Sequence, residues 1–196
     1  MADIKKTEYF IDRQKWREWL SENYAKEKEI WLVFPAKSSG EKSISYNDAV
    51  EEALCFGWID GRTGTLDDKH LLRRFTPRRK GSSYSQPNIE RLLEMDRQGL
   101  IHPEVKKSVK KVIGKRFIYP EDILAALRKD KQVWKNYKRF SDPYKRIRIA
   151  YIDAARKRPA EFDRRLNNFI NKTRENKLIM GYGGIDKYYQ KKDDSK

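Results

Sequence analysis

The hydrophobic pattern of the chain changes character near residue 100. Before that point, "IWLVFPA" (residues 30–36) is a continuous apolar, β-prone run bounded by charged residues, which is typical of a buried strand. The segments "WIDGRTGTLDD" and "HLLRRFTPRR" are β-prone and meet at Asp67 and Asp68, which indicates a hairpin. After residue 100 only basic segments with helical spacing remain. The pattern predicts an α+β fold with a small, at least partly antiparallel sheet and an all-helical C-terminal lobe.

Helices are predicted on both sides of this change. Apolar spacing and capping residues favour helices from residue 12 to about 24, from 45 to 57, from 85 to 99 and over 103–113. Helical spacing then continues to residue 177, with two segments that begin at a proline. We expect residues 1–99 to form an α/β lobe, 100–116 a connecting helix, 117–177 a helical module, and 178–196 a tail with a loose end.

The positive charge of the chain is unevenly placed. The net charge is +16; residues 1–68 carry 10 basic and 14 acidic side chains, whereas residues 69–196 carry 35 basic and 15 acidic ones. Such an excess attracts polyanions, but lysine-rich surfaces also simply keep proteins soluble. Lysines and aromatic residues alternate in "VWKNYKRF". This pattern fits either a nucleic-acid surface or an amphipathic helix with its aromatic rings inside.

Several classes of protein are disfavoured by composition. One cysteine and two histidines allow no intramolecular disulfide and match no zinc spacing. Neither a signal peptide nor an apolar stretch of about 18 residues is present, so we expect a cytoplasmic protein without a membrane span. Phosphate-binding glycine motifs are also missing from the sequence. The sequence therefore predicts no cofactor, no metal site and no catalytic residue, and it specifies no oligomeric state.

Cys55 is the only cysteine of the chain and therefore the only candidate thiol nucleophile. It lies in the last turn of a predicted helix, where the partial negative charge of the helix end raises a thiol pKa. We therefore expect a structural, half-covered cysteine. The neighbouring carboxylates Glu51 and Glu52 are expected to be solvated, and Asp60 fits a turn with Gly61.

The densest polar cluster is "RRFTPRRKGSSYSQPN", residues 73–88. Guanidinium groups, hydroxyls and a helix N-terminus together favour an anion site. The predicted ligand-binding residues are Arg62, Arg74, Arg78, Arg79 and Ser82, with Trp58, Asp60 and Tyr84 as walls. In the alternative interpretation the arginines pair with Asp60, Asp67 or Asp68, and the serines only cap the helix.

Several stretches resemble a known family. "IWLVFPAK", "ISYNDAVEEALCFGWIDGR", "RFTPRRKGSSYSQPN" and the helical run from "YPEDILAALRKDKQVW" to "AEFDRRLNNFI" are similar to the YdeI/OmpD-associated, bacteriocin-protection proteins. The resemblance spans residues 8 to 177. It implies a link to bacteriocin or envelope-stress protection and places "CFGWIDGR" and "FTPRR" in one site, but it supplies no catalytic residues.

Three functional hypotheses follow from the sequence. The first is a non-enzymatic binding protein for a small anion or an acidic protein partner. The alternative is a nucleic-acid-binding protein that uses the basic C-terminal portion. The third is an enzyme that uses Cys55 or Asp60.

Overall fold

The computed structural model describes residues 6–181 and 186–189. The chain divides into two compact units, Met1–Gly114 and Lys115–Lys196. The first unit contains a four-stranded sheet and helices, and the described part of the second contains helices alone. The predicted α+β fold is confirmed.

The sheet of the first unit is mostly antiparallel. Its strands are β1 (Thr7–Glu8), β2 (Ile30–Pro35), β3 (Trp58–Asp67) and β4 (His70–Pro77), in the order β1-β2-β4-β3. Only β1 and β2 run parallel. β3 and β4 form the predicted hairpin, whose turn is fixed because the Asp67 carboxylate accepts a hydrogen bond from the Lys69 amide at 2.8 Å. Two register shifts interrupt the β3–β4 ladder, so the edge strand β3 is irregular near Gly61.

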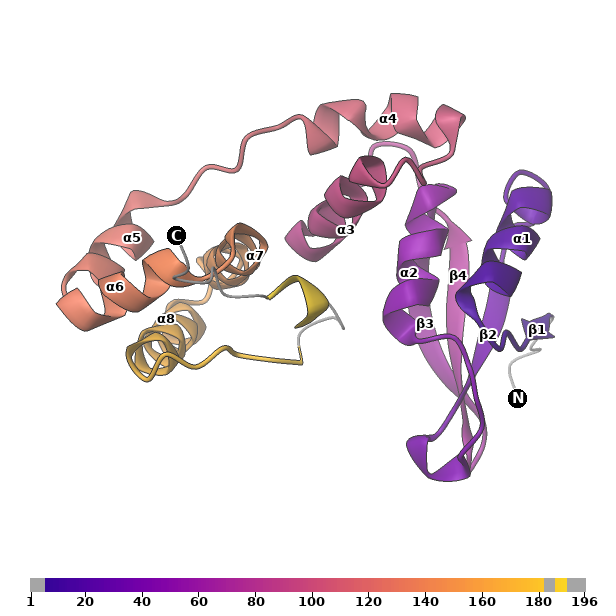
Figure 1. The fold of residues 1–196 in the computed structure, drawn as a ribbon, viewed down its shortest axis with the longest axis horizontal. Coiled ribbons are helices and arrows are strands. Elements are labelled where there is room, and N and C mark those ends of the chain that lie inside the picture. Colours follow the sequence, from indigo (N-terminus) through magenta and orange to yellow (C-terminus); the bar gives the residue numbers. More distant parts are fainter. Residues whose placement is uncertain (1–5, 182–185, 190–196) are drawn as a thin grey trace. The chain divides into compact units, whose positions relative to one another are not determined.

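Helices α1 (Arg13–Asn23) and α2 (Tyr46–Cys55) pack on one face of this sheet (Figure 1). Asp12 and Ser45 cap their N-termini by accepting hydrogen bonds from backbone amides. The core between helices and sheet is largely aromatic and aliphatic, with Trp16, Leu20, Leu54, Trp58 and Phe75 almost fully buried. α2 therefore lies at the centre of the unit, and eight of its ten residues are buried.

Helix α2 stops at a glycine with a left-handed backbone. Gly57 has φ 75°, which an L side chain rarely adopts, and its carbonyl accepts the Arg78 amide at 2.9 Å. A short 3-10 turn (Lys37–Ser39) follows β2, and α3 (Gln86–Arg97) and α4 (Pro103–Ile113) complete the unit. α4, predicted as a connector, buries Val105 and Val109 in the first core.

The second unit contains α5 (Glu121–Arg128), α6 (Lys131–Arg139), α7 (Asp142–Asp153) and α8 (Pro159–Arg174). Its core includes Phe140, Tyr144, Ile147 and Phe169. The aromatic residues that alternate with lysines in α6 are directed inward: Tyr137 is buried, and Trp134 is half-buried and stacks on it at 5.3 Å between ring centroids. The amphipathic interpretation of this helix is thus confirmed.

Part of the predicted tail belongs to the second core. Leu178, Ile179 and Tyr188 pack against it, the last from a 3-10 turn (Asp186–Tyr188), and Tyr189 is 2% exposed. Aromatic side chains drive this packing, because the Tyr189 ring lies 4.8 Å from that of Tyr144. The loose end expected for the tail, residues 190–196, lies outside the described residues. Among the described residues, none of the helices has the length and apolar character needed to cross a membrane.

Candidate functional site

One arginine of the predicted anion loop, Arg78, contacts other residues of the same loop. The Arg78 guanidinium lies 3.7 Å from the centroid of the Tyr84 ring. Its Nη2 donates to the Ser82 hydroxyl at 3.0 Å and to the Ser83 carbonyl at 2.9 Å. The structure therefore brings Arg78, Ser82 and Tyr84 together, with Nη2 of the guanidinium engaged inside the loop.

The other predicted ligand residues do not converge on this loop. Arg74 donates to Glu29, with Nε 3.0 Å from the carboxylate. Arg79 is exposed. Arg62 is exposed four residues beyond Trp58 on β3, which corresponds to about 13 Å along an extended strand. The "CFGWIDGR" stretch and the basic loop meet where Trp58 pairs with Pro77 and where the Gly57 carbonyl accepts the Arg78 amide.

The predicted walls also have internal partners. The indole of Trp58 is buried and donates to the Tyr24 carbonyl at 3.0 Å. Asp60 accepts a hydrogen bond from the Tyr46 hydroxyl at 2.6 Å and lies 3.9 Å from Arg73. Burial, and next the Asp60 carboxylate, raise the pKa of Tyr46 to about 12. The alternative interpretation paired the loop arginines with Asp60, Asp67 or Asp68. Asp60 does pair with an arginine, Arg73, whereas Asp67 pairs with His70 at 2.8 Å.

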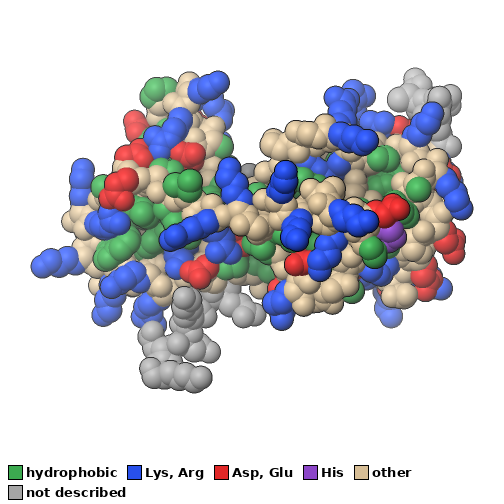
Figure 2. All heavy atoms as spheres, turned by 90° about the horizontal axis from the view of Figure 1, so that it is seen from above, with side chains coloured by type: hydrophobic (Ala, Val, Ile, Leu, Met, Phe, Trp, Pro, Cys, Tyr) green, Lys and Arg blue, Asp and Glu red, His purple; other side chains and the backbone are tan. Residues whose placement is uncertain are grey.

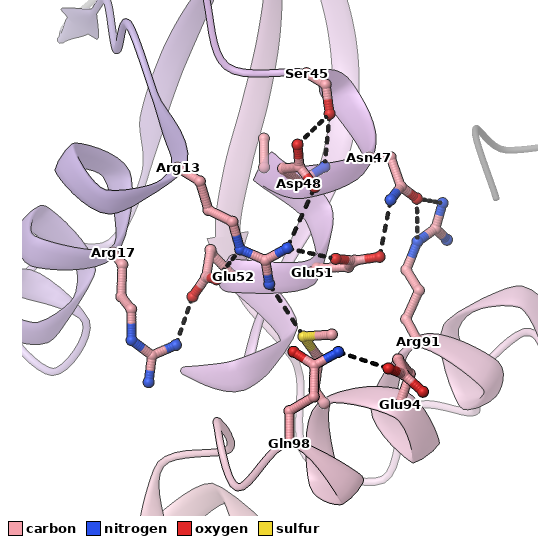
Figure 3. Close-up of polar contacts among 12 residues, drawn as sticks. Arg13, Arg17, Ser45, Asn47, Asp48, Glu51, Glu52, Arg91, Glu94 and Gln98 are labelled. Carbon is pink, nitrogen blue, oxygen red and sulfur yellow. Dashed lines mark hydrogen bonds and ion pairs between the residues drawn. The ribbon is translucent and has the colours of Figure 1, made fainter. Parts of the chain in front are cut away.

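The first unit also contains a buried ion network, which was not predicted from the sequence. Glu52 is 1% exposed and accepts hydrogen bonds from Arg13 and Arg17, the latter at 2.5 Å (Figure 3). Arg17 also donates to the Leu100 carbonyl at 2.8 Å. The network thereby joins α1, α2 and the segment after α3.

A second branch of the network crosses α2 toward α3. Arg13 donates to Glu51 at 2.8 Å, and Asn47 donates to the same carboxylate at 2.8 Å. The Asn47 carbonyl oxygen in turn accepts from Nε and Nη2 of Arg91, each at 3.1 Å (Figure 3). Glu51 is fully buried, so these contacts replace the water it loses on folding.

The expectation that Glu51 and Glu52 are solvated is wrong. Both are buried because α2 is covered by α1 and α3 as well as by the sheet. A signal for this was present, since Arg13 and Arg17 are spaced i, i+4 on the helix that also carries Trp16 and Leu20. The network holds three helices in place. In the described residues, no group of three or more His, Cys, Asp or Glu side chains has metal-binding geometry.

Cys55 is more deeply buried than expected. Its exposure is 0%, whereas a half-covered side chain was predicted. Burial, and next the neighbouring Glu52 carboxylate, raise the pKa of its thiol to about 12. A thiol held protonated and away from solvent is a poor nucleophile, so the structure favours the structural role.

An exposed basic stripe lies on α4. We define the α4 stripe as Lys107, Lys110 and Lys111, which are exposed and form no ion pair with any described residue. Lys106 differs because it pairs with Asp96 at 2.8 Å. Figure 2 shows the face seen from above in Figure 1, the side on which α4 lies. Among the charged side chains on this face, Lys and Arg are more frequent than Asp and Glu. The stripe is thus a cationic surface of the first unit without an internal counter-ion among the described residues.

Comparisons with known families divide the chain in the same way as the fold. Residues 8–108 match the model of a domain of unknown function, DUF8412, and because this match covers more than half of the sequence, the chain belongs to that family. Residues 116–176, the helices of the second unit, match the family described as "Bacteriocin-protection, YdeI or OmpD-Associated". The predicted family is therefore confirmed for the helical module, while the N-terminal stretches match the separate domain model. No curated protein and no solved structure gives a significant match.

Proposed function

We propose that the chain is a non-enzymatic binding protein that recognises an acidic segment of a protein partner, and that it contributes in this way to bacteriocin protection. The family description of residues 116–176 supports the second part of the proposal. The observation that carries the first part is the α4 stripe, three exposed lysines on a helix that is fixed to the first core by Val105 and Val109.

The stripe carries an electrostatic cost that an anionic partner would relieve. Lys107 and Lys111 are one helical turn apart, and like charges at this spacing destabilise a helix. The negative end of the helix dipole offsets part of this repulsion, because Lys110 and Lys111 lie in the last turn. A carboxylate-rich segment placed over the stripe would compensate the remainder.

A protein partner fits the stripe better than a nucleic acid does. Lys107 and Lys111 span four residues, about 6 Å along the helix axis, so the stripe reaches few phosphates. Single-stranded nucleic acid also requires aromatic platforms for its bases. In α6, where aromatic residues and lysines alternate, the rings pack in the second core.

The test is fluorescence anisotropy with a labelled polyglutamate peptide and a labelled DNA duplex, at low and near-physiological salt. We expect the peptide to bind at both salt concentrations and the triple variant K107Q/K110Q/K111Q to bind it about tenfold more weakly, since each lost contact contributes about 0.2–1 kcal/mol. The matched control is K26Q/K42Q/K69Q, which removes three exposed lysines of the same unit that form no ion pair with a described residue.

Two outcomes would contradict the proposal. Equal loss of binding in both triple variants would show that only the overall charge matters. Tighter binding of the duplex than of the peptide at near-physiological salt would favour the nucleic-acid hypothesis. The role in protection is tested separately, by bacteriocin survival of a strain that lacks the gene and is complemented with wild type or with K107Q/K110Q/K111Q.

A further inference from the structure

The second unit contains a pocket of about 190 Å³ between α7, α8 and the segment 179–181. Its polar lining comprises Arg148 and Tyr151 from α7 and Arg165 and Asn168 from α8. Its accessible apolar lining includes Ile179 and Met180. Two of the nine lining residues are arginines and none is acidic, so the pocket favours an anion.

Arg165 is held in a fixed orientation by hydrogen bonds from two of its three guanidinium nitrogens. Its guanidinium lies 3.7 Å from the centroid of the Tyr151 ring. Nη1 donates to the Tyr151 carbonyl at 2.6 Å, and Nε donates to Glu161 at 2.7 Å. Nη2 forms no hydrogen bond with any described residue. These contacts preorganise the group, so a ligand that binds Nη2 has little side-chain entropy to remove.

Arg148 forms a second, more deeply buried cationic wall. Its exposure is 4%, and Nη2 donates to the Ile179 carbonyl. The rings of Tyr144 and Tyr189 lie 5.7 and 5.6 Å from its guanidinium carbon. Arg148 thus places a second guanidinium in the pocket lining, where its carbonyl and ring contacts hold it in position.

The unused donors and the apolar wall together define the ligand. The side-chain amide of Asn168 is exposed and, like Nη2 of Arg165, forms no hydrogen bond with a described residue. These few donors match the two oxygens of a carboxylate better than the three acceptor oxygens of a phosphate monoester. Met180, which is 55% exposed, and the half-buried Ile179 offer contact for an apolar body next to the charged head.

We propose that this pocket binds a small organic carboxylate, whose head group contacts Nη2 of Arg165 and the amide of Asn168 and whose apolar part contacts Met180. The site lies in the second unit, so it does not depend on the α4 stripe or on the acidic partner proposed above.

The proposal can be tested on the full-length protein with benzoate as the probe, by amide chemical-shift titration. We expect saturable shifts at residues of α7 and α8, with benzamide, which has the same ring but no charge, binding at least about tenfold more weakly. The variant Arg165→Met keeps the aliphatic stem but removes the donors, and we expect it to weaken benzoate binding about tenfold or more.

The matched control is Arg164→Met. Arg164 also pairs with Glu161, at 2.7 Å, but it does not line the pocket, so benzoate binding should stay at the wild-type level. Circular dichroism of both variants reports whether α8 is intact. The proposal is overturned by non-saturable shifts with benzoate, by equal binding of benzamide, or by equal effects of the two arginine variants. Tighter binding of phenyl phosphate than of benzoate would overturn the assignment to carboxylates.

Discussion

The two units handle their charged side chains in opposite ways. In the first unit, Glu51 and Glu52 lie inside the fold, at 0% and 1% exposure, and are bound by arginines of a neighbouring helix. In the second unit, the ion pairs lie mostly outside, as in the contacts of Arg156 with Asp122 and of Arg164 with Glu161. Since water screens exposed pairs and not buried ones, the same chemical pair has a large effect in one unit and a small effect in the other.

The largest expected effect concerns Cys55, next to the buried carboxylate Glu52. Its thiol pKa of about 12 makes the reactive thiolate scarce at pH 8, so reaction with a disulfide reagent should be slower than in the urea-unfolded chain by about a thousandfold. The rate of colour release from an aromatic disulfide measures this. A native rate similar to the unfolded rate would contradict a dry, protonated interior in the first unit.

The aromatic core of the second unit should be almost as sensitive. Phe169 is 1% exposed, and its ring lies 6.1 Å from that of Tyr144. We expect Phe169→Ala to lower the free energy of unfolding of this unit by about 4 kcal/mol, because it removes buried area and leaves a cavity. Urea denaturation is the measurement. Ile118→Ala, at a side chain with 78% exposure, is the control and should change little.

Replacing a buried carboxylate should destabilise the first unit slightly less. We expect Glu52→Gln to cost about 3 kcal/mol, because Arg13 and Arg17 both lose a charged partner while remaining partly buried. Glu18→Gln removes an exposed carboxylate that pairs with Lys15 and is the control. If both variants unfold at the same urea concentration, burial does not distinguish the two kinds of ion pair.

The smallest effect is expected at the surface of the second unit. Hydrogen bonds from Arg164 and Arg165 lower the pKa of Glu161 from 4.5 to about 2. A lowered folded-state pKa stabilises the fold above pH 4.5, and this contribution is lost as the pH falls toward 2. Glu161→Gln should therefore leave the urea midpoint at pH 7 nearly unchanged and make its decline between pH 4.5 and 2 slightly shallower than in wild type. A large decrease of the urea midpoint at pH 7 would contradict the conclusion that exposed ion pairs of the second unit contribute little to stability.

Local signals in the sequence were sufficient for the architecture. The turn at Asp67 and Asp68 and the continuous apolar strand predicted the antiparallel hairpin and its partner β2, and helical spacing after residue 100 predicted the helical unit. These features depend on neighbours in the chain, which is why periodicity and turn residues reveal them.

The arrangement of charged residues depended on contacts distant in the chain. Glu52 reaches Arg17 across 35 positions, and Arg74 pairs with Glu29 rather than with the nearby Asp60 or Asp67. Local spacing places Arg13 and Arg17 on one side of α1 but does not identify their partners. Arg78 contacts Ser82 and Tyr84 of its own loop, an arrangement that the sequence did not predict, and the anion site itself stays a prediction.

The bond from Arg17 to the Leu100 carbonyl has a consequence for synthesis of the protein on the ribosome. It joins residues 83 positions apart, and the core of the same unit also requires Val109 from α4. While the chain is being made, α1 and α2 emerge long before these contacts can form, and translation adds about 5–20 residues per second. The nascent chain therefore carries Trp16, Leu20 and Leu54 for several seconds before their later packing partners have been made.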